Sequence, residues 1–410
     1  MADDVRRVAM VSMHTSPAAT PGQADAGGMN VAILGLAREL AGRGIAVDLL
    51  TRSSGQSTVT DIAPGITLHE LEAGPPGIVA KEDLSSVADE FGEAVARLAG
   101  RESGRYDVIH AHYWISGIAA LPVAIELGIP FVQSFHTLGD MKHRAMIDEV
   151  PTEPQRRVRS ESFLANQADA VIASSTAEVD ALLEQVGAPA EHVWIMPPGV
   201  DTGLFAPRPE AGAAVREALG IEADRPVIAV VGRVQELKGQ RLAVRVLAAL
   251  PEPRPVLVIA GRPTPGAESY FLALHELAAE LGVVDDLRFT GALEREAVAE
   301  LFAAATLTLV PSHSETFGLV ALESAASGTP VVAQRVSGLV ESVSDGESGL
   351  LIDSRDPADW ARAIGVLLDN PAAYAELARS ARAFAEGFSW ETSVSVLLDV
   401  YESVAARPVL

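Results

Sequence analysis

Two glutamates, Glu315 and Glu323, stand eight residues apart in the stretch "SETFGLVALES", which is otherwise apolar, small or turn-forming. The apolar neighbours of Glu323 predict a buried helix, and a buried carboxylate needs hydrogen-bonding partners. An ionised carboxylate accepts two hydrogen bonds from a vicinal diol, so the hydroxyl groups of a sugar or ribose suit such a site. The alternative for Glu323 is an ordinary exposed glutamate on a helix.

Two cations, Arg233 and Lys238, belong to a second motif, "VVGRVQELKGQ". This motif follows a predicted strand and leads into a predicted helix, whose first N–H groups attract anions. Two cations and a helix N-terminus together suit a diphosphate, although each cation alone would more often be a solvated surface charge. Because the sequence contains no Asp-x-Asp, we expect protein cations rather than a metal to neutralise a departing diphosphate.

A long loop, "HTSPAATPGQADAGGMN", separates the first predicted strand from the first predicted helix. Gly27 and Gly28 permit close approach of a ligand to the backbone at the start of the helix, and Asn30 offers a side-chain amide. The length of the loop favours a binding role over simple filler. A glycine pair that only starts a helix is the alternative.

Three histidines stand on or just after predicted strands. His136, in "SFHTLG", ends one strand and is the histidine that we place beside a reacting sugar, although a lone histidine at such a place is more often structural. His110 and His112 share one side of another strand, which is compatible with a metal site. The sequence offers no evident third ligand, so a metal there is the less favoured interpretation.

Short β-branched runs alternate with alanine- and leucine-rich helical segments, as in a parallel sheet with crossover helices. The alternation stops at "VWIMPPGVDTGLFAPRPEAG" and then restarts, which predicts two doubly wound α/β domains, residues 1–198 and 199–388. The last helical segment, residues 389–410, is expected to pack back on the first domain. Ligands bind beyond the carboxyl ends of such strands, so Glu315 and Glu323 should face one crevice. The single G-x-G, in "GRGIAVDLL", follows a helix and indicates helix termination rather than dinucleotide binding.

The composition limits the classes of partner. The 410 residues include 31 lysines and arginines against 55 aspartates and glutamates, a net charge of −24 that disfavours nucleic acid and anionic membranes. The lack of cysteine excludes disulfides, thiolate zinc sites and cysteine nucleophiles and suits a reducing compartment. The N-terminal stretch is interpreted as a strand rather than a signal peptide, and no apolar run reaches the ~20 residues of a membrane span. We therefore expect a cytoplasmic protein.

The E-x7-E motif in its setting "SETFGLVALESAASGTPVV" resembles the signature of family-4 retaining glycosyltransferases with the GT-B fold, in which two Rossmann-like domains face each other across a cleft. This resemblance implies that Glu323 holds the ribose of a nucleotide and that Glu315 lies beside the donor sugar. It also implies that Arg233 and Lys238 bind the diphosphate without a catalytic metal. The backbone of residues 317–319 would cap the outer hydroxyl groups of the sugar.

The glycine loop is similar, more narrowly, to that of the mycothiol-pathway glycosyltransferases, which join N-acetylglucosamine from its uridine diphosphate donor to 1D-myo-inositol 3-phosphate. The resemblance implies four sets of residues. The catalytic set is His136, Arg233, Lys238 and Glu315. The donor-binding set is Thr20, Pro21, Gly28, Arg233, Lys238, Leu293, Glu315, Phe317, Gly318, Leu319 and Glu323. The acceptor-binding set is His14, Asp25, Ala26, Gly27, Gly28, Met29, Asn30, Lys81, Tyr113, Thr137 and Arg157. A structural Mg²⁺ would be held near Phe302, Ala303, Ala305 and Thr329.

Two positions depart from the mycothiol enzymes, which commonly carry tyrosine at the place of Ala32 and asparagine at that of His143. Both flank the expected acceptor pocket, so another nucleotide sugar, cyclitol or aminocyclitol remains an alternative. Two more distant alternatives are an epimerase of uridine diphosphate sugars and a nucleotide-sugar sensor without turnover. A homodimer is left open by the sequence.

Overall fold

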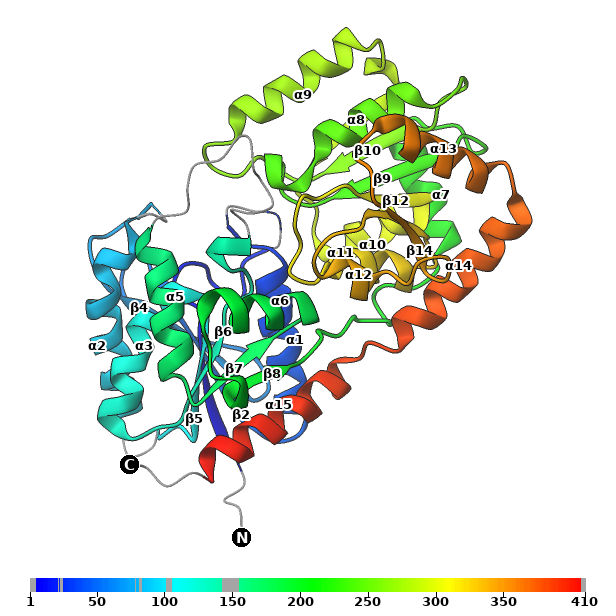
Figure 1. Cartoon of the computed structure of the whole chain (residues 1–410). Coiled ribbons are helices and arrows are strands. Elements are labelled where there is room, and N and C mark those ends of the chain that lie inside the picture. The colour runs from blue at the N-terminus through cyan, green and yellow to red at the C-terminus, as the bar shows by residue number, and fades with distance from the viewer. Residues whose placement is uncertain are drawn as a thin grey trace. The chain divides into compact units, whose positions relative to one another are not determined.

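The computed structural model describes residues 5–20, 22, 25–77, 79–80, 83–100, 105–141 and 155–406. The chain forms two compact units, which we describe separately (Figure 1). Unit 1 comprises Met1–Ala19, Met29–Gly199 and Trp390–Leu410, and unit 2 comprises Thr20–Gly28 and Val200–Ser389. Each unit is built around a mainly parallel sheet with helices, so the predicted fold class of two doubly wound α/β domains is confirmed.

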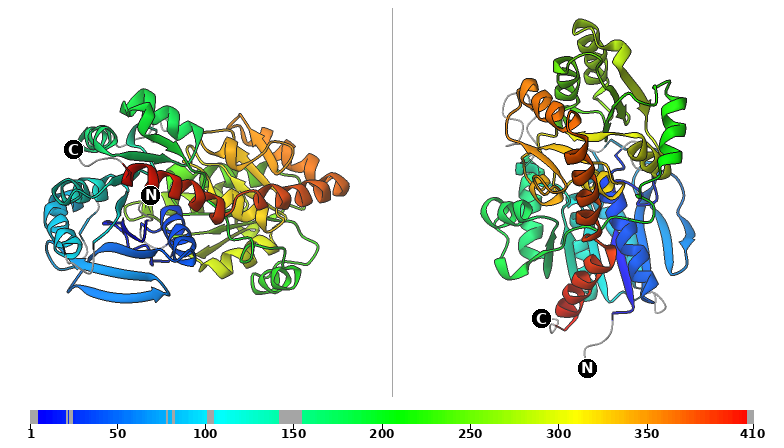
Figure 2. Two further views of the ribbon diagram at one scale, coloured as in Figure 1. Left: turned by 90° about the horizontal axis from the view of Figure 1, so that it is seen from below. Right: turned by 90° about the vertical axis from the view of Figure 1, so that its right-hand side faces the viewer.

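Unit 1 contains a sheet of eight described strands in the order β3-β4-β2-β1-β5-β6-β7-β8. Neighbouring strands are parallel except for β3 and β4, the antiparallel pair at one edge, drawn in blue in Figure 2. The strands are β1 Arg7–Val11, β2 Ala46–Ser53, β3 Thr58–Ala63, β4 Ile66–Glu72, β5 Val108–His112, β6 Phe131–Ser134, β7 Ala170–Ala173 and β8 Val193–Ile195. The central strands β1, β5 and β6 are buried except for Arg7 at the start of β1, as expected for a sheet covered on both faces.

The helices of unit 1 cover both faces of this sheet. They are α1 Gly28–Gly42, η1 Leu84–Val87, α2 Ala88–Ala99, α3 Trp114–Leu127, α5 Gln155–Gln167, α6 Thr176–Ala181, η3 Leu182–Val186, η4 Ala190–His192 and α15 Trp390–Ala405. Helix α15 comes from the end of the sequence, and its Val394, Leu397 and Tyr401 pack with Val8 and Met10 of β1. The last helix of the chain therefore contributes to the apolar core on one face of this sheet.

Unit 2 contains six described parallel strands in the order β11-β10-β9-β12-β13-β14. They are β9 Val227–Val231, β10 Val256–Ala260, β11 Leu287–Gly291, β12 Leu307–Val310, β13 Val331–Gln334 and β14 Gly349–Ile352. The helices are α7 Pro209–Ala218, η5 Glu236–Lys238, α8 Gln240–Ala249, α9 Glu268–Glu280, η6 Val284–Asp286, α10 Arg295–Ala304, α11 Leu319–Ala326, α12 Leu339–Ser342, α13 Pro357–Leu368 and α14 Pro371–Glu386. Within the described ranges of both units, no helix is long and apolar enough to span a membrane.

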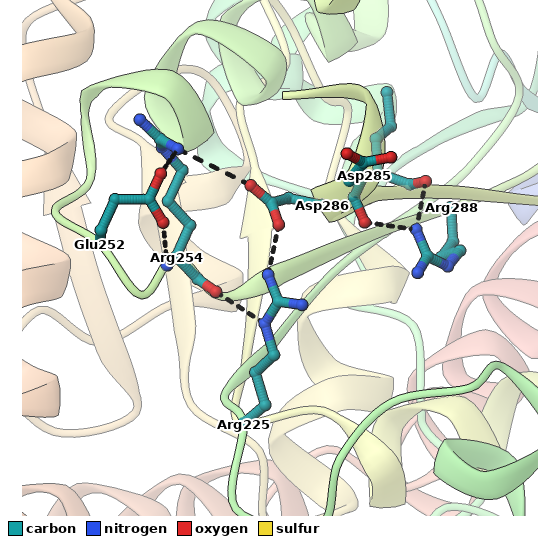
Figure 3. A network of polar contacts seen from close by, with 7 residues as sticks. Arg225, Glu252, Arg254, Asp285, Asp286 and Arg288 are labelled. Atoms are coloured by element: carbon teal, nitrogen blue, oxygen red, sulfur yellow. Dashed lines mark hydrogen bonds and ion pairs between the residues drawn. The ribbon is translucent and has the colours of Figure 1, made fainter. Parts of the chain in front are cut away.

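A polar network fastens the amino ends of three strands of unit 2 (Figure 3). Arg225, Arg254 and Asp286 lie just before β9, β10 and β11. Arg225 forms an ion pair with Asp286 and donates from Nε to the carbonyl of Arg254 at 2.9 Å. Arg254 also lies 3.8 Å from Asp286 and pairs with Glu252. The network holds the end of the sheet that is formed by the amino ends of the strands. The candidate residues stand at the opposite end, beyond the carboxyl ends of the strands.

The glycine loop does not belong to the domain that was expected from its place in the chain. The segment Thr20–Gly28 belongs to unit 2, although the chain on both sides of it belongs to unit 1. Its polar side chains explain this, because Thr20 Oγ1 lies 3.2 Å from both carboxylate oxygens of Glu294 and Asp25 Oδ1 lies 3.1 Å from Arg233. Local sequence gives no sign of partners so far away in the chain.

Candidate active site

Lys238 and Glu315 form the centre of the polar cluster of unit 2. Lys238 ends the short turn η5 after β9, and Glu315 stands in the loop after β12. Lys238 Nζ lies 2.5 Å from Glu315 Oε1, which also accepts a hydrogen bond of 2.8 Å from Ser312 Oγ. The two charged side chains are 25% and 12% exposed, so each keeps a surface through which a ligand is reached. The structure thus brings together two residues that the sequence assigned to the donor.

The two loops that carry this pair are fastened to each other. The backbone N–H of His313 donates to the carbonyl of Leu237 at 2.8 Å. Gly239 has a φ of +70°, and a Cβ there would lie 2.1 Å from the carbonyl oxygen of Pro311. Arg355 donates to that same carbonyl at 3.2 Å. The close packing of backbone against backbone explains why glycine follows Lys238 at this position.

Arg233 lies beside the glycine loop. Its NH1 group donates to Asp25 Oδ1 at 3.1 Å, and its backbone carbonyl accepts from Gln240 Nε2 at 2.9 Å. A Cβ on Gly27 would lie 4.0 Å from Arg233 Nε, and one on Gly28 would lie 3.6 Å from Leu319. The expected donor cation therefore has an anionic partner from the segment that the sequence assigned to the acceptor.

Glu323 is buried on α11, as its apolar neighbours predicted. Its Oε1 accepts a hydrogen bond of 2.9 Å from Arg295 NH1, at the start of α10. Burial raises the pKa of Glu323 above its usual value, while the positive charge of Arg295 opposes this rise. Glu315 and Glu323 thus have different partners, Lys238 and Arg295.

Three further residues that the sequence assigned to the donor, Gly318, Phe317 and Leu293, also lie in unit 2. Gly318 precedes α11 with a φ of +100°, and a Cβ there would lie 2.6 Å from Leu339, so its conformation and its packing both require glycine. The first N–H groups of a helix have no partner within the helix, so the start of α11 is suited to donating hydrogen bonds to hydroxyl oxygens. Phe317 is buried, and Leu293 packs against the core beside Leu301.

Four residues assigned to the acceptor meet in unit 1. The guanidinium of Arg157 lies 5.1 Å from the centre of the Tyr113 ring and donates to Thr137 Oγ1 at 3.0 Å. The rings of His14 and Tyr113 are 4.5 Å apart. Arg157 Nε also donates to Glu161 Oε1 at 2.7 Å, and this pair is almost completely buried. A cation, a hydroxyl and an aromatic ring converge there, which is chemistry suited to a phosphate.

The histidines form a connected group beside the carboxyl end of β5. His112 Nδ1 lies 2.8 Å from His136 Nε2, and the two rings are stacked with centres 5.1 Å apart. His110 is bonded at 2.8 Å to both Tyr401 Oη and Ser134 Oγ. Burial lowers the pKa of His110 to about 3 and that of His136 to about 4, and the pKa of His112 is also well below its usual value. The group is therefore uncharged at neutral pH.

The remaining assigned residues are distributed differently. Asn30 is buried and donates to the carbonyl of Ser16 at 2.7 Å, so its amide helps to fix the start of the glycine loop. Ala26 is buried in unit 2, and Met29 packs against both apolar cores of unit 1. Pro21, Lys81 and the variable position His143 lie outside the described residues.

The residues of the expected magnesium site gather at the carboxyl end of α10. Thr329 Oγ1 donates to the carbonyl of Phe302 at 2.7 Å, and the N–H of Ala305 points to the same carbonyl at 3.1 Å. Carbonyl and hydroxyl oxygens are ligands that Mg²⁺ accepts, but this carbonyl already has two donors within the protein. Among the described side chains, no cluster of three acidic, histidine or cysteine residues offers a metal site. Magnesium at this position stays a prediction.

Arg295, Ser312 and Glu161 are polar residues of these clusters that were not predicted. Two of them carry a usable signal in the sequence. Arg295 follows β11 much as Arg233 follows β9, and Glu161 stands four residues after Arg157 on one helix, the spacing of a helical ion pair. Ser312 has no comparable signal.

Two doubly wound domains whose candidate residues follow the carboxyl ends of the strands agree with the GT-B class of glycosyltransferases, and the comparisons show this class. Residues 26–204 match the family described as Glycosyltransferase Family 4, and residues 213–384 match Glycosyl transferases group 1. A D-inositol 3-phosphate glycosyltransferase of Acidothermus cellulolyticus is 44% identical over 98% of this chain and 91% of its own. A relative of the same name from Stackebrandtia nassauensis is 42% identical over 98% of this chain and 92% of its own. The chain therefore belongs to the family-4 glycosyltransferases.

A solved structure supports the same assignment of fold. The sucrose-phosphate synthase of Thermosynechococcus elongatus superposes with a TM-score of 0.89 at 30% identity, covering 97% of this chain and 98% of that one. The predictions of the family, the fold and a glycosyltransferase activity are thus confirmed. The roles of individual residues stay predictions.

Proposed function

We propose that the protein transfers N-acetylglucosamine from its uridine diphosphate donor to 1D-myo-inositol 3-phosphate with retention of configuration at the anomeric carbon. The observation that carries this proposal is the 44% identity, over almost the full length, to a relative named D-inositol 3-phosphate glycosyltransferase. The geometry of the two units is compatible with this pair of substrates, since unit 2 carries Arg233 and Lys238 and unit 1 places Arg157 beside Thr137 and Tyr113.

On the donor side, Arg233 and Lys238 are the groups proposed to bind the diphosphate. Both now have carboxylate partners, Asp25 and Glu315, at 3.1 and 2.5 Å. A diphosphate carries more negative charge than a single carboxylate and competes for the same cations. Glu323 is proposed to accept hydrogen bonds from the ribose hydroxyl groups.

On the acceptor side, Arg157, Thr137 and Tyr113 are proposed to bind the phosphate of the inositol. Arg157 is held by Glu161 at 2.7 Å, which orients its guanidinium. His136 is proposed to lie beside the donor sugar. Because its pKa is lowered to about 4, it is neutral at pH 7 and adds no positive charge to the sugar site.

In the proposed mechanism the bond between the anomeric carbon and the β-phosphate oxygen breaks first. Arg233 and Lys238 stabilise the negative charge that develops on the leaving diphosphate. An acceptor hydroxyl then forms the new bond on the same face, and its proton passes to the departing phosphate oxygen. The protein supplies no nucleophile in this scheme. A structural Mg²⁺ at the end of α10, if bound, would act on the fold of unit 2 and not on the reaction.

The test is a product assay by mass spectrometry. The protein is incubated with uridine diphosphate N-acetylglucosamine and, in separate reactions, with inositol 3-phosphate, unphosphorylated inositol and an aminocyclitol. We expect product chiefly with inositol 3-phosphate. Proton NMR of the isolated product should show, from the coupling constant of the new anomeric proton, the same anomeric configuration as in the donor. Product with another cyclitol and none with inositol 3-phosphate would overturn the proposed acceptor.

Transfer to another cyclitol or to an aminocyclitol is the second candidate function, because Ala32 replaces the usual tyrosine on α1. Ala32 is buried in the structure, so no hydroxyl group is available at this position. Conversion of the donor without an acceptor would instead indicate an epimerase, and binding of the donor without any product would indicate a sensor.

A further inference from the structure

Arg295 is a cation that the proposed mechanism does not use. It is the first residue of α10, and its side chain is 24% exposed. One nitrogen donates to Glu323 Oε1 at 2.9 Å, and the guanidinium lies 5.0 Å from the centre of the buried Phe205 ring. These two contacts hold the Arg295 side chain more firmly in place than a freely solvated arginine is held.

Glu323 needs such a partner, because its surroundings disfavour a negative charge. Its neighbours on α11 are buried and apolar, and the carboxylate of Asp201 adds repulsion. Helix α14 packs against α11 and carries Arg382, but that guanidinium donates to the carbonyls of Thr202, Phe205 and Ala326. Among the described residues, Arg295 is the side chain that donates to Glu323.

The second carboxylate oxygen of Glu323, Oε2, has no hydrogen-bond partner among the described residues. It is not among the fully buried side-chain atoms that lack a partner, so it keeps some exposed surface. A carboxylate oxygen that is bonded to Arg295 keeps a further lone pair, and Oε2 keeps two. The ion pair thus leaves enough acceptor capacity for two hydroxyl groups.

We propose that Arg295 is a positioning residue, which holds Glu323 through Oε1 so that its carboxylate accepts the two ribose hydroxyl groups of a nucleoside diphosphate. This inference rests on the proposed function, from which it takes the ribose. Arg295 makes the site selective for ribonucleotides, because its contribution to binding passes through Glu323 and vanishes when the hydroxyl groups are missing. A direct contact of Arg295 with the diphosphate is the opposing explanation.

The experiment measures dissociation constants by titration calorimetry for uridine diphosphate and for its 2′,3′-dideoxy analogue. The variants are Arg295→Met, Arg295→Lys and, as a matched control, Arg379→Met, which removes an exposed arginine of α14. We expect Arg295→Met to weaken uridine diphosphate at least about tenfold, the effect of one lost charge-assisted hydrogen bond. The dideoxy analogue should bind wild type and Arg295→Met alike, and Arg295→Lys should recover most of the affinity. Arg379→Met should behave as wild type.

An equal loss of affinity for both ligands in Arg295→Met would overturn the inference, because Arg295 would then act on the diphosphate or through the fold. A double-mutant cycle with Glu323→Gln gives an independent check if Arg295→Met folds poorly. Arg295→Gln, which shortens the side chain and removes its charge, should weaken the binding of uridine diphosphate to the otherwise wild-type protein and change its affinity no further in the Glu323→Gln background. A further loss in that background contradicts the inference.

A failure of the proposed function would give a different experimental result from a failure of this inference. A wild-type protein that does not bind uridine diphosphate at all contradicts the proposed donor. A wild-type protein that binds the nucleotide and its dideoxy analogue equally well contradicts the role of the ribose and this inference, but leaves the diphosphate assignment standing.

Discussion

The candidate residues of the two units are held in opposite electrostatic states. In unit 2 three cations each pair with a carboxylate: Lys238 with Glu315, Arg233 with Asp25 and Arg295 with Glu323. All six side chains are between 10% and 25% exposed. In unit 1 the group beside β5 consists of histidines that are neutral at pH 7, because burial lowers their pKa values.

This difference shows that the two units use charged and neutral side chains in different ways. A partly exposed ion pair, such as Lys238–Glu315 or Arg233–Asp25, exchanges its carboxylate for an anionic ligand at small cost, because solvent already screens it. A buried histidine gains a charge only at high cost, so it keeps one state and one geometry. Unit 2 is therefore suited to a ligand whose charge changes during the reaction, and the histidine group is suited to fixing positions. The buried pair Arg157–Glu161 is an exception within unit 1.

The largest expected effect is the sensitivity of the histidine group to acid. The pKa values of His110 and His136 are lowered to about 3 and about 4 from 6.5, so the unfolded state binds their protons more readily below pH 6.5. Their stabilising contribution is therefore present above pH 6.5 and is lost as the pH falls toward 4 or 3. At pH 5 the two together should cost about 4 kcal/mol of the free energy of unfolding.

Chemical denaturation at pH 7 and pH 5 measures this loss, compared between wild type and His110→Asn. The difference between the two pH values should shrink by about 2 kcal/mol in the variant. His275→Asn, which replaces an exposed histidine of unit 2, serves as the control. An unchanged pH dependence in His110→Asn would show that His110 is not held neutral by the fold.

The charged pair of unit 2 is tested by Lys238→Ala. We expect turnover to fall by roughly 10²-fold or more, because a group that stabilises charge on the leaving diphosphate is lost. Initial rates with the donor sugar and the acceptor measure this, with Arg245→Ala on the exposed side of α8 as a control for lost positive charge. Near-normal turnover in Lys238→Ala would reject the assignment of this lysine to the diphosphate.

The third prediction compares the same substitution in both units. Tyr401→Phe removes the hydroxyl that is bonded to His110 at 2.8 Å and leaves a buried ring nitrogen without its partner. We expect it to lower the free energy of unfolding by about 1–3 kcal/mol. Tyr374→Phe removes a half-buried hydroxyl that donates to the carbonyl of Thr306 at 2.9 Å and should cost less. Equal costs in urea denaturation would contradict the special role of buried polar groups in unit 1.

The smallest effect is expected at the glycine loop. Asp25→Asn removes the anion that competes with a diphosphate for Arg233, so uridine diphosphate should bind about two- to fivefold more tightly, the scale of an exposed ion pair. Calorimetric titration detects such a change, and Glu376→Gln on α14 is the control. Weaker binding in Asp25→Asn would mean that Asp25 supports the donor site rather than competing for its cation.

The fold was predictable from the sequence because its signals are local. The strand before Arg233, the helix that carries Glu323 and the proline- and glycine-rich segment after Trp194 all follow from residue patterns a few positions long. The places of the two motifs around Arg233 and Glu315 were predictable for the same reason, since each follows the carboxyl end of a strand. Arg295 and Glu161 were missed because a single charge on a helix usually belongs to the solvated surface.

The sequence by itself determined which segments form strands and helices and which polar residues follow the carboxyl ends of the strands. Only the tertiary structure decided how those residues are paired. Lys238 and Glu315 are 77 residues apart, Arg233 and Asp25 are 208 apart, and His110 and Tyr401 are 291 apart. Such partners are chosen by the packing of whole elements, and a hydrogen bond or a shift in pKa depends on distances of a few ångströms that no local pattern encodes.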